Sequence, residues 1–125
     1  MTALLDSDIV IEILRQRDAS ILSQWSQLAD SETLILTTPV TVAEIEAGAR
    51  PSETRKIEHF FSLLECAPID EHIGKLAGEL MRRYSRSHNL EIADALIAAT
   101  AIRRQAALWT RNRKHYPMPE LVFYA

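Results

Sequence analysis

Hydrophobic residues follow two spacings along the chain, one typical of short buried strands and one typical of amphipathic helices. Short apolar or β-branched runs predict strands at 3–5, 33–38, 65–69, 107–110 and 120–124. Apolar residues that recur every three or four positions predict helices around 9–14, 22–28, 41–49, 52–64, 70–84 and 91–104. Because strands alternate with helices, the sequence predicts a three-layer α/β/α fold with a mainly parallel central sheet, formed as one domain over 1–125.

Polar residues at the predicted helix starts have two interpretations, as helix caps or as members of a site. Ser7 or Asp8 is a suitable N-cap for the first helix. The segment 41–44, Thr-Val-Ala-Glu, has the T-x-x-E pattern of a capping box. Asp94 is expected in the first turn of an alanine-rich helix, where an acidic side chain complements the helix dipole. Each acid therefore has a structural explanation of its own.

Composition favours an ordinary globular protein, with 47% hydrophobic and 25% charged residues. No apolar run approaches the roughly 20 residues that a membrane span needs, and no signal-peptide pattern begins the chain. We therefore expect a cytoplasmic location. Cys66 is the single cysteine, so it forms no internal disulfide, and we expect it to be a small buried hydrophobe.

Charge is unevenly distributed, although the net charge is only −3. Residues 1–81 carry 6 Lys/Arg and 14 Asp/Glu, whereas residues 82–115 carry 8 and 2. This segregation is compatible with an acidic site and a basic surface for a polyanion on one molecule.

Four polar side chains are expected near the carboxyl ends of the predicted strands, where ligands bind in sheets of this type. They are Asp6, Glu44, Asp94 and Asn112. Asp94 is the only charge in the apolar stretch 92–97, and a buried carboxylate needs a partner. If the topology is correct, these four residues meet at one edge of the sheet.

The segments that carry these residues resemble the signature segments of PIN-domain ribonucleases, and more narrowly the toxins of VapBC-type toxin–antitoxin pairs. In order, the segments are "LLDSDIVIEIL", "TTPVTVAEIEAG", "LEIADALIAATAI" and "LWTRNRKHY", and the resemblance runs from residue 4 to about 116. It identifies Asp6, Glu44 and Asp94 as the first, second and third catalytic acids and as metal ligands.

The resemblance also assigns roles to neighbours of the acids. Asn112 stands where many members of the family carry a fourth acid, and we include it among the catalytic residues. Ser7, Asp8 and Thr110 are expected to support the site.

Clustered carboxylates explain why such a site needs a cation. Carboxylates within a few ångströms of each other repel, and one keeps its proton unless a positive charge is present. Mg²⁺ or Mn²⁺, which prefer oxygen ligands, relieves this repulsion and activates a water for attack on a phosphodiester. The resemblance thus implies a metal-dependent endoribonuclease toxin that acts on RNA, pairs with a cognate antitoxin and forms a homodimer.

Two basic clusters are candidates for RNA phosphate contacts, and a solvated surface is the alternative for each. The first is Arg111, Arg113 and Lys114, and the second is Arg82, Arg83 and Arg86. The large aromatic residues Trp25, Phe60, Phe61 and Trp109 are expected in the core or an interface rather than as platforms for bases.

Two other classes of protein also place acids after a first strand. A haloacid-dehalogenase-like phosphatase would use Asp6 as nucleophile and Asp8 as acid, but its later lysine and acidic pair are not found. A non-catalytic receiver-like module needs an aspartate after the third strand, where this chain has Cys66-Ala67-Pro68.

Overall fold

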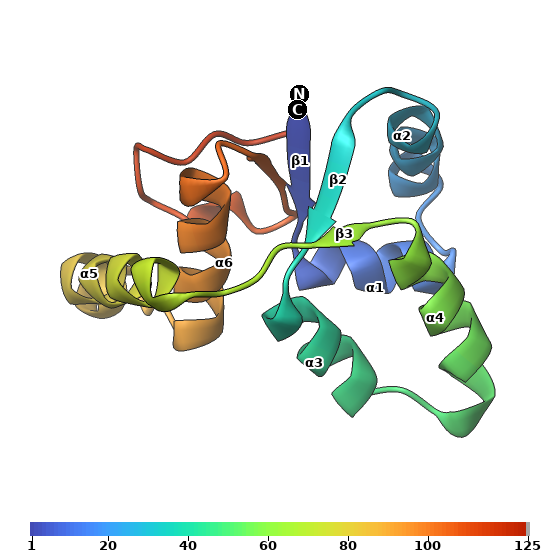
Figure 1. The fold of residues 1–125 in the computed structure, drawn as a ribbon, viewed down its shortest axis with the longest axis horizontal. Coiled ribbons are helices and arrows are strands. Elements are labelled where there is room, and N and C mark those ends of the chain that lie inside the picture. The colour runs from blue at the N-terminus through green and yellow to red at the C-terminus, as the bar shows by residue number, and fades with distance from the viewer. Residues whose placement is uncertain (125) are drawn as a thin grey trace.

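A computed structural model describes residues 1–124 and contains a parallel sheet between two layers of helices, as the sequence predicted (Figure 1). The sheet has the strand order β3-β2-β1-β4. Its strands are β1 (Thr2–Leu5), β2 (Leu34–Thr37), β3 (Glu65–Cys66) and β4 (Ala107–Trp109). Because all the pairings are parallel, the carboxyl ends of the strands lie at one edge.

Helices cover both faces of the sheet (Figure 1). One face carries α5 (Glu71–His88) and α6 (Ile92–Arg103), which pack against each other. The other carries α1 (Ser7–Arg15), α2 (Ala19–Ala29) and α4 (Thr54–Ser62). Helix α3 (Pro39–Ala47) contacts both α1 and α6, and in Figure 1 it lies beyond the carboxyl ends of the strands. Short 3₁₀ turns follow at η1 (Pro51–Glu53) and η2 (Arg113–His115).

The sheet separates two hydrophobic cores because successive side chains of a strand point to opposite faces. Leu4 belongs to the core under α5 and α6, whereas Ala3 and Leu5 belong to the core under α1, α2 and α4. All three are fully buried. The two cores are large enough to fix β1 firmly between its neighbours, and with it the residue that follows, Asp6.

The prediction of a strand at 120–124 is wrong. This segment makes only an isolated bridge to β4, in which Leu108 N donates to Val122 O and Tyr124 N donates to Leu108 O. The predicted strand at 65–69 is reduced to two residues, because Pro68 has no N–H to continue a ladder. Cys66 is exposed, which contradicts the expected burial, since this short edge strand leaves its side chain uncovered.

The structure differs from the sequence prediction in one cap assignment and excludes one capping alternative. The N-cap of α1 is Asp6, not Ser7 or Asp8. Helix α3 begins at Pro39 and is capped by Thr38, whose Oγ1 accepts from Thr41 N. Thr41 and Glu44 therefore form no capping box, and Glu44 lies in the middle of the helix, where its side chain is free for another role. Asp94 does lie in the first turn of α6, as predicted.

No helix within residues 1–124 is both long enough and apolar enough to cross a membrane.

Candidate active site

Acidic residues lie at the edge of the sheet where the strands end, and this region, with Asp6, Asp8, Glu44 and Asp94, is called the acidic edge. Asp6 is its buried centre. It leaves β1 directly, its backbone N donates to Trp109 O, and its side chain is 8% exposed. Oδ1 accepts from Ser7 N at 2.8 Å. Oδ2 accepts from Thr110 Oγ1 and from the Tyr116 hydroxyl, both at 2.8 Å. These donors hold the carboxylate in one orientation. Burial, and then the charge of Asp6, raises the pKa of the Tyr116 hydroxyl far above its usual range, so this hydroxyl keeps its proton and remains a donor.

Ser7 joins Glu44 to the same region. The Ser7 hydroxyl donates to Glu44 Oε1 at 2.6 Å, and its oxygen lies 3.4 Å from Thr41 Oγ1. Because Ser7 begins α1 and Glu44 lies on α3, this contact ties two helices that are 37 residues apart in sequence. Ser7, which the sequence predicted to support the site, thus contacts both the Asp6 carboxylate, through its backbone N–H, and the Glu44 carboxylate, through its hydroxyl.

Asp94 approaches from the opposite layer, on the first turn of α6. It is half-buried, and burial together with the charge of Asp6 raises the pKa of its carboxyl group, while His115 opposes the rise. An electrostatic effect of Asp6 on Asp94 requires the two groups to be near each other. The structure therefore brings Asp94 to the acidic edge through packing of α6 against the sheet.

Asp8 is a fourth acid at this edge, and its surroundings disfavour its ionised form. Its Oδ2 accepts from Arg111 N at 3.0 Å, but its Oδ1 is buried and has no hydrogen-bond partner among residues 1–124. Burial first, and then the charge of Asp6, raises the pKa of Asp8 to about 6, although the Arg111 N–H lowers it. A buried carboxylate oxygen without a donor is costly, and a cation is one way to satisfy it.

The segment after β4 contributes backbone and side-chain contacts at this edge. Asn112 N donates to Thr110 Oγ1, so Thr110 links Asp6 to the start of η2. The side chain of Asn112 is exposed, as is that of Lys114. Thr110, which was predicted to support the site, therefore contacts Asp6 directly, whereas no contact within residues 1–124 links the Asn112 side chain to the acids.

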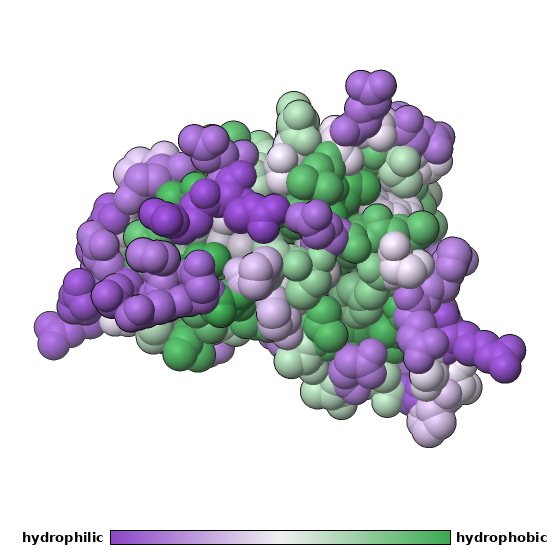
Figure 2. All heavy atoms as spheres, in the orientation of Figure 1, coloured by the Kyte–Doolittle hydropathy of each residue, from purple (hydrophilic) through white to green (hydrophobic). Residues whose placement is uncertain are grey.

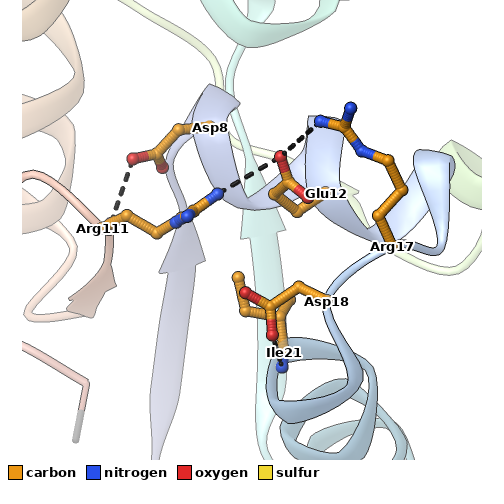
Figure 3. Close-up of polar contacts among 6 residues, drawn as sticks. All are labelled: Asp8, Glu12, Arg17, Asp18, Ile21 and Arg111. Atoms are coloured by element: carbon orange, nitrogen blue, oxygen red, sulfur yellow. Dashed lines mark hydrogen bonds and ion pairs between the residues drawn. The ribbon is translucent and has the colours of Figure 1, made fainter.

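Arg111 is held by a carboxylate on α1 rather than left free (Figure 3). Its Nη1 lies 3.2 Å from Glu12 Oε1, which also accepts from Arg17 Nη2 at 3.1 Å. The Glu12 side chain is 11% exposed, and that of Arg111 is 50% exposed. Glu12 therefore fixes the direction of the Arg111 side chain while leaving half of it accessible.

The second basic cluster lies on α5, in the other layer. Arg82 and Arg86 are exposed. Arg83 donates to Glu120 Oε2 at 2.9 Å and to the Tyr84 hydroxyl at 2.8 Å, and it lies over the Tyr84 ring. Arg83 is thus used in a surface network, which is the alternative that the sequence left open for this cluster.

Sequence reasoning missed three contributors to the site. Tyr116 donates to Asp6 across 110 residues, and no local pattern marks such a contact. Glu12 lies at a position that the apolar spacing of α1 places on its buried face, and a charged residue at such a position indicates a specific partner. The Thr38 hydroxyl caps α3 and places Thr41 against Ser7, a role that the T-T-P order before a helix indicates.

Whether these residues suit a divalent metal depends on the number of ligands required. Within residues 1–124, no three His, Cys, Asp or Glu side chains are close enough to hold one ion by themselves. Mg²⁺, however, keeps several waters and is commonly bound by one or two carboxylates plus substrate phosphate. Burial, and then the charge of Asp6, raises the pKa of Asp8 and of Asp94, and a nearby cation would offset both effects. Asp8 Oδ1 has no hydrogen-bond partner among residues 1–124 and could face such a cation. The residues fit a hydrated Mg²⁺ or Mn²⁺ and do not fit a fully protein-coordinated ion.

Fold and site together define an α/β/α domain with carboxylates from both layers at the carboxyl edge of a parallel sheet. The chain belongs to the PIN-domain family, whose model matches residues 3–121, and within it to the VapC group. It is 37% identical over 118 residues to Ribonuclease VapC10 of Mycobacterium tuberculosis, covering 94% of this chain and 87% of the relative. Ribonuclease VapC19 of the same organism is 37% identical over 120 residues, covering 94% and 95%.

Solved structures of similar fold come from complexes. VapBC2 from Rickettsia felis, bound to a promoter DNA fragment, superposes with a TM-score of 0.81 at 24% identity, covering 99% of this chain and 98% of the other. DNA-bound VapBC from Salmonella typhimurium gives 0.82 at 20% identity, covering 99% and 98%. At these identities the structures support the fold, and the family assignment rests on the sequence matches. The family assignment excludes the phosphatase and receiver alternatives.

Proposed function

We propose that this chain is the ribonuclease toxin of a VapBC-type toxin–antitoxin pair and that it hydrolyses RNA with the help of Mg²⁺ or Mn²⁺. The observation that carries this proposal is the placement of Asp94, and of Glu44 through Ser7, in the region of Asp6, in a chain 37% identical to proteins named as ribonucleases. One or two carboxylates held by a hydroxyl network suit phosphodiester hydrolysis, because a hydrated Mg²⁺ can complete its coordination with waters and the substrate phosphate.

Each residue has a role set by its contacts. Asp6, at the end of β1, and Asp94, in the first turn of α6, would bind the metal ion directly. Ser7 holds Glu44 at the same edge, where its carboxylate can accept a proton from a water at the ion. Thr110 and Tyr116 keep Asp6 Oδ2 aligned. When bound, the ion would polarise the phosphodiester and lower the pKa of a coordinated water.

The first test is metal-dependent cleavage. After removal of metal with EDTA, the purified chain should cut single-stranded RNA only once millimolar Mg²⁺ or Mn²⁺ is restored. The same addition should raise the melting temperature, because a ligand at about a hundredfold excess over its Kd stabilises the native state by about 2.7 kcal/mol. Sodium chloride at matched ionic strength is the control. Cleavage that persists in EDTA, with an unchanged melting curve, would contradict the proposal.

A pocket beside the acidic edge, with both apolar and charged lining, is suited to the antitoxin. It has a volume of about 340 Å³ and lies between α1, α3 and α4. Ile11, Leu14, Ile45 and Ile57 supply its apolar lining, and Arg15, Glu44, Arg50 and Glu53 supply its charged lining. Figure 2 shows hydrophobic residues gathered over this part of the surface, between α3 and α4. An antitoxin segment with apolar side chains and a basic residue would fill the pocket and place positive charge beside Glu44.

Substitution in this pocket should separate antitoxin control from catalysis. Leu14→Glu is expected to weaken binding of the co-expressed antitoxin at least about tenfold, because it puts a charge into an apolar contact. Cells should then stay growth-arrested despite the antitoxin, while cleavage by the isolated toxin is unchanged. Leu63→Glu, at an exposed leucine outside the pocket, is the matched control. Normal neutralisation of Leu14→Glu would place the antitoxin elsewhere.

The homodimer stays a prediction from the family resemblance. The cytoplasmic location stays a prediction from composition, and the RNA contacts of Arg82 and Arg86 stay a prediction from the clustering of basic residues. We propose all three on those grounds.

A further inference from the structure

A second pocket shares a wall with the acidic site. It has a volume of about 270 Å³ and lies between the start of α2, the end of β4 and the C-terminal segment. Its buried part is apolar and formed by Ile9, Ile21 and Trp109. Its margin is polar, with Asp18, Ser20 and Gln24 on one side and Arg111 and Arg113 on the other. The pocket therefore offers an apolar interior, hydrogen-bonding groups and two cations within a small space.

An aromatic ring forms the remaining side of this pocket. Tyr124 is half-buried and packs on Trp109, with ring centroids 5.5 Å apart. Its position is fixed by two backbone contacts, since Tyr124 N donates to Leu108 O and Arg113 Nη2 donates to Tyr124 O. A half-buried aromatic ring backed by another aromatic residue is a rigid surface for stacking a planar group.

Two residues connect this pocket to the acids. Thr110 lines the pocket and donates its hydroxyl to Asp6, and Arg111 lines it and donates its backbone N–H to Asp8. Glu12 holds the Arg111 guanidinium, as Figure 3 shows, with Asp18 lying below it. A polymer whose phosphate lies at the acidic edge can therefore place its neighbouring unit in the pocket.

We propose that this pocket is a nucleotide subsite, which takes up one base of the RNA strand next to the scissile phosphate; this rests on the proposed ribonuclease function. The base stacks on Tyr124 inside the pocket, and its edge meets Asp18 and Gln24. Its phosphate lies against Arg113 and the exposed half of Arg111. The opposite orientation is unfavourable because the Asp18 carboxylate repels a phosphate. Stacking on an aromatic ring accepts every base, and the polar margin adds preference among them.

The test measures binding without catalysis. Single-stranded RNA octamers and abasic octamers of equal charge are titrated in EDTA against the full chain, by fluorescence anisotropy. The RNA with bases should bind about tenfold more tightly than the abasic strand, because stacking of one base on an aromatic ring contributes about that factor to the affinity. Tyr124→Leu should remove this difference and Tyr124→Phe should retain it. Arg113→Ala should weaken both strands and reduce the salt slope by about one.

Two further variants guard against unfolding as an explanation. Ser20→Trp fills the pocket from an exposed position, and it should also remove the preference for bases, whereas Ser26→Trp, exposed on the same helix, should not. Phe61→Leu is the matched control for Tyr124→Leu, because both aromatics are half-buried against the same core. An unchanged preference for bases in Tyr124→Leu and Ser20→Trp overturns the subsite. Because no cleavage is measured, this result is separate from any failure of the ribonuclease proposal.

Discussion

Asp94→Asn is expected to lower Mg²⁺-dependent RNA cleavage by at least about 100-fold, since losing a metal site's outer partners alone costs about 10–100-fold. The change removes the only carboxylate that α6 brings to the acidic edge. The substitution keeps the shape of the side chain and removes a negative charge that is repelled by the Asp6 carboxylate. The folded protein should therefore be as stable as the wild type, or more stable, when metal is absent.

Three measurements separate the role of Asp94 from a folding defect. Cleavage rates should be compared by gel at saturating Mg²⁺, and thermal unfolding should be followed by circular dichroism with and without the ion. Asp94→Asn should also lose most of the metal-induced rise in melting temperature. Glu46→Gln, an exposed acid on α3 two residues from Glu44, is the control and should behave as wild type. Full cleavage by Asp94→Asn would reject Asp94 as a metal ligand.

Asp8→Asn is expected to stabilise the metal-free protein by about 1–2 kcal/mol at pH 7. Folding raises the pKa of Asp8 from 3.8 to about 6, because burial and the charge of Asp6 disfavour its ionised form. Each unit of pKa difference corresponds to about 1.4 kcal/mol, and solvent screening at a half-buried group reduces the effect. An amide keeps an oxygen that can accept from Arg111 N and carries no charge.

The sign of the pH dependence follows from the direction of that shift. In the wild type, the folded state binds the Asp8 proton more tightly than the unfolded state does. The contribution of this tighter proton binding to the free energy of unfolding is therefore fully present below pH 3.8 and is lost as pH rises to about 6. The advantage of Asp8→Asn should be absent at pH 3.5, grow between pH 4 and pH 6, and then level off. Urea titrations in EDTA at several pH values measure it, and an advantage that does not vary with pH would contradict this account.

Most of the fold could be predicted because it depends on short-range patterns. The spacing of apolar residues identified β1, β2, β4 and the helices α1 to α6, and the alternation of strands and helices indicated the parallel sheet. Predictions were wrong where a local pattern competes with tertiary contacts. The 120–124 segment has strand composition, but it reaches β4 only at Leu108. Glu44 has a capping-box spacing from Thr41, but Thr38 and Pro39 begin the helix earlier.

The amino-acid sequence by itself determined which acids are available and that strands would end beside them, since both follow from residue type and spacing. The order β3-β2-β1-β4, the Ser7–Glu44 contact and the Tyr116–Asp6 contact were decided only by the tertiary structure. The two side-chain contacts join residues 37 and 110 positions apart. Only the packing of both cores against the sheet selects one arrangement among those that the local patterns allow. The pocket beside Tyr124 has the same origin, because its wall is assembled from three distant parts of the chain.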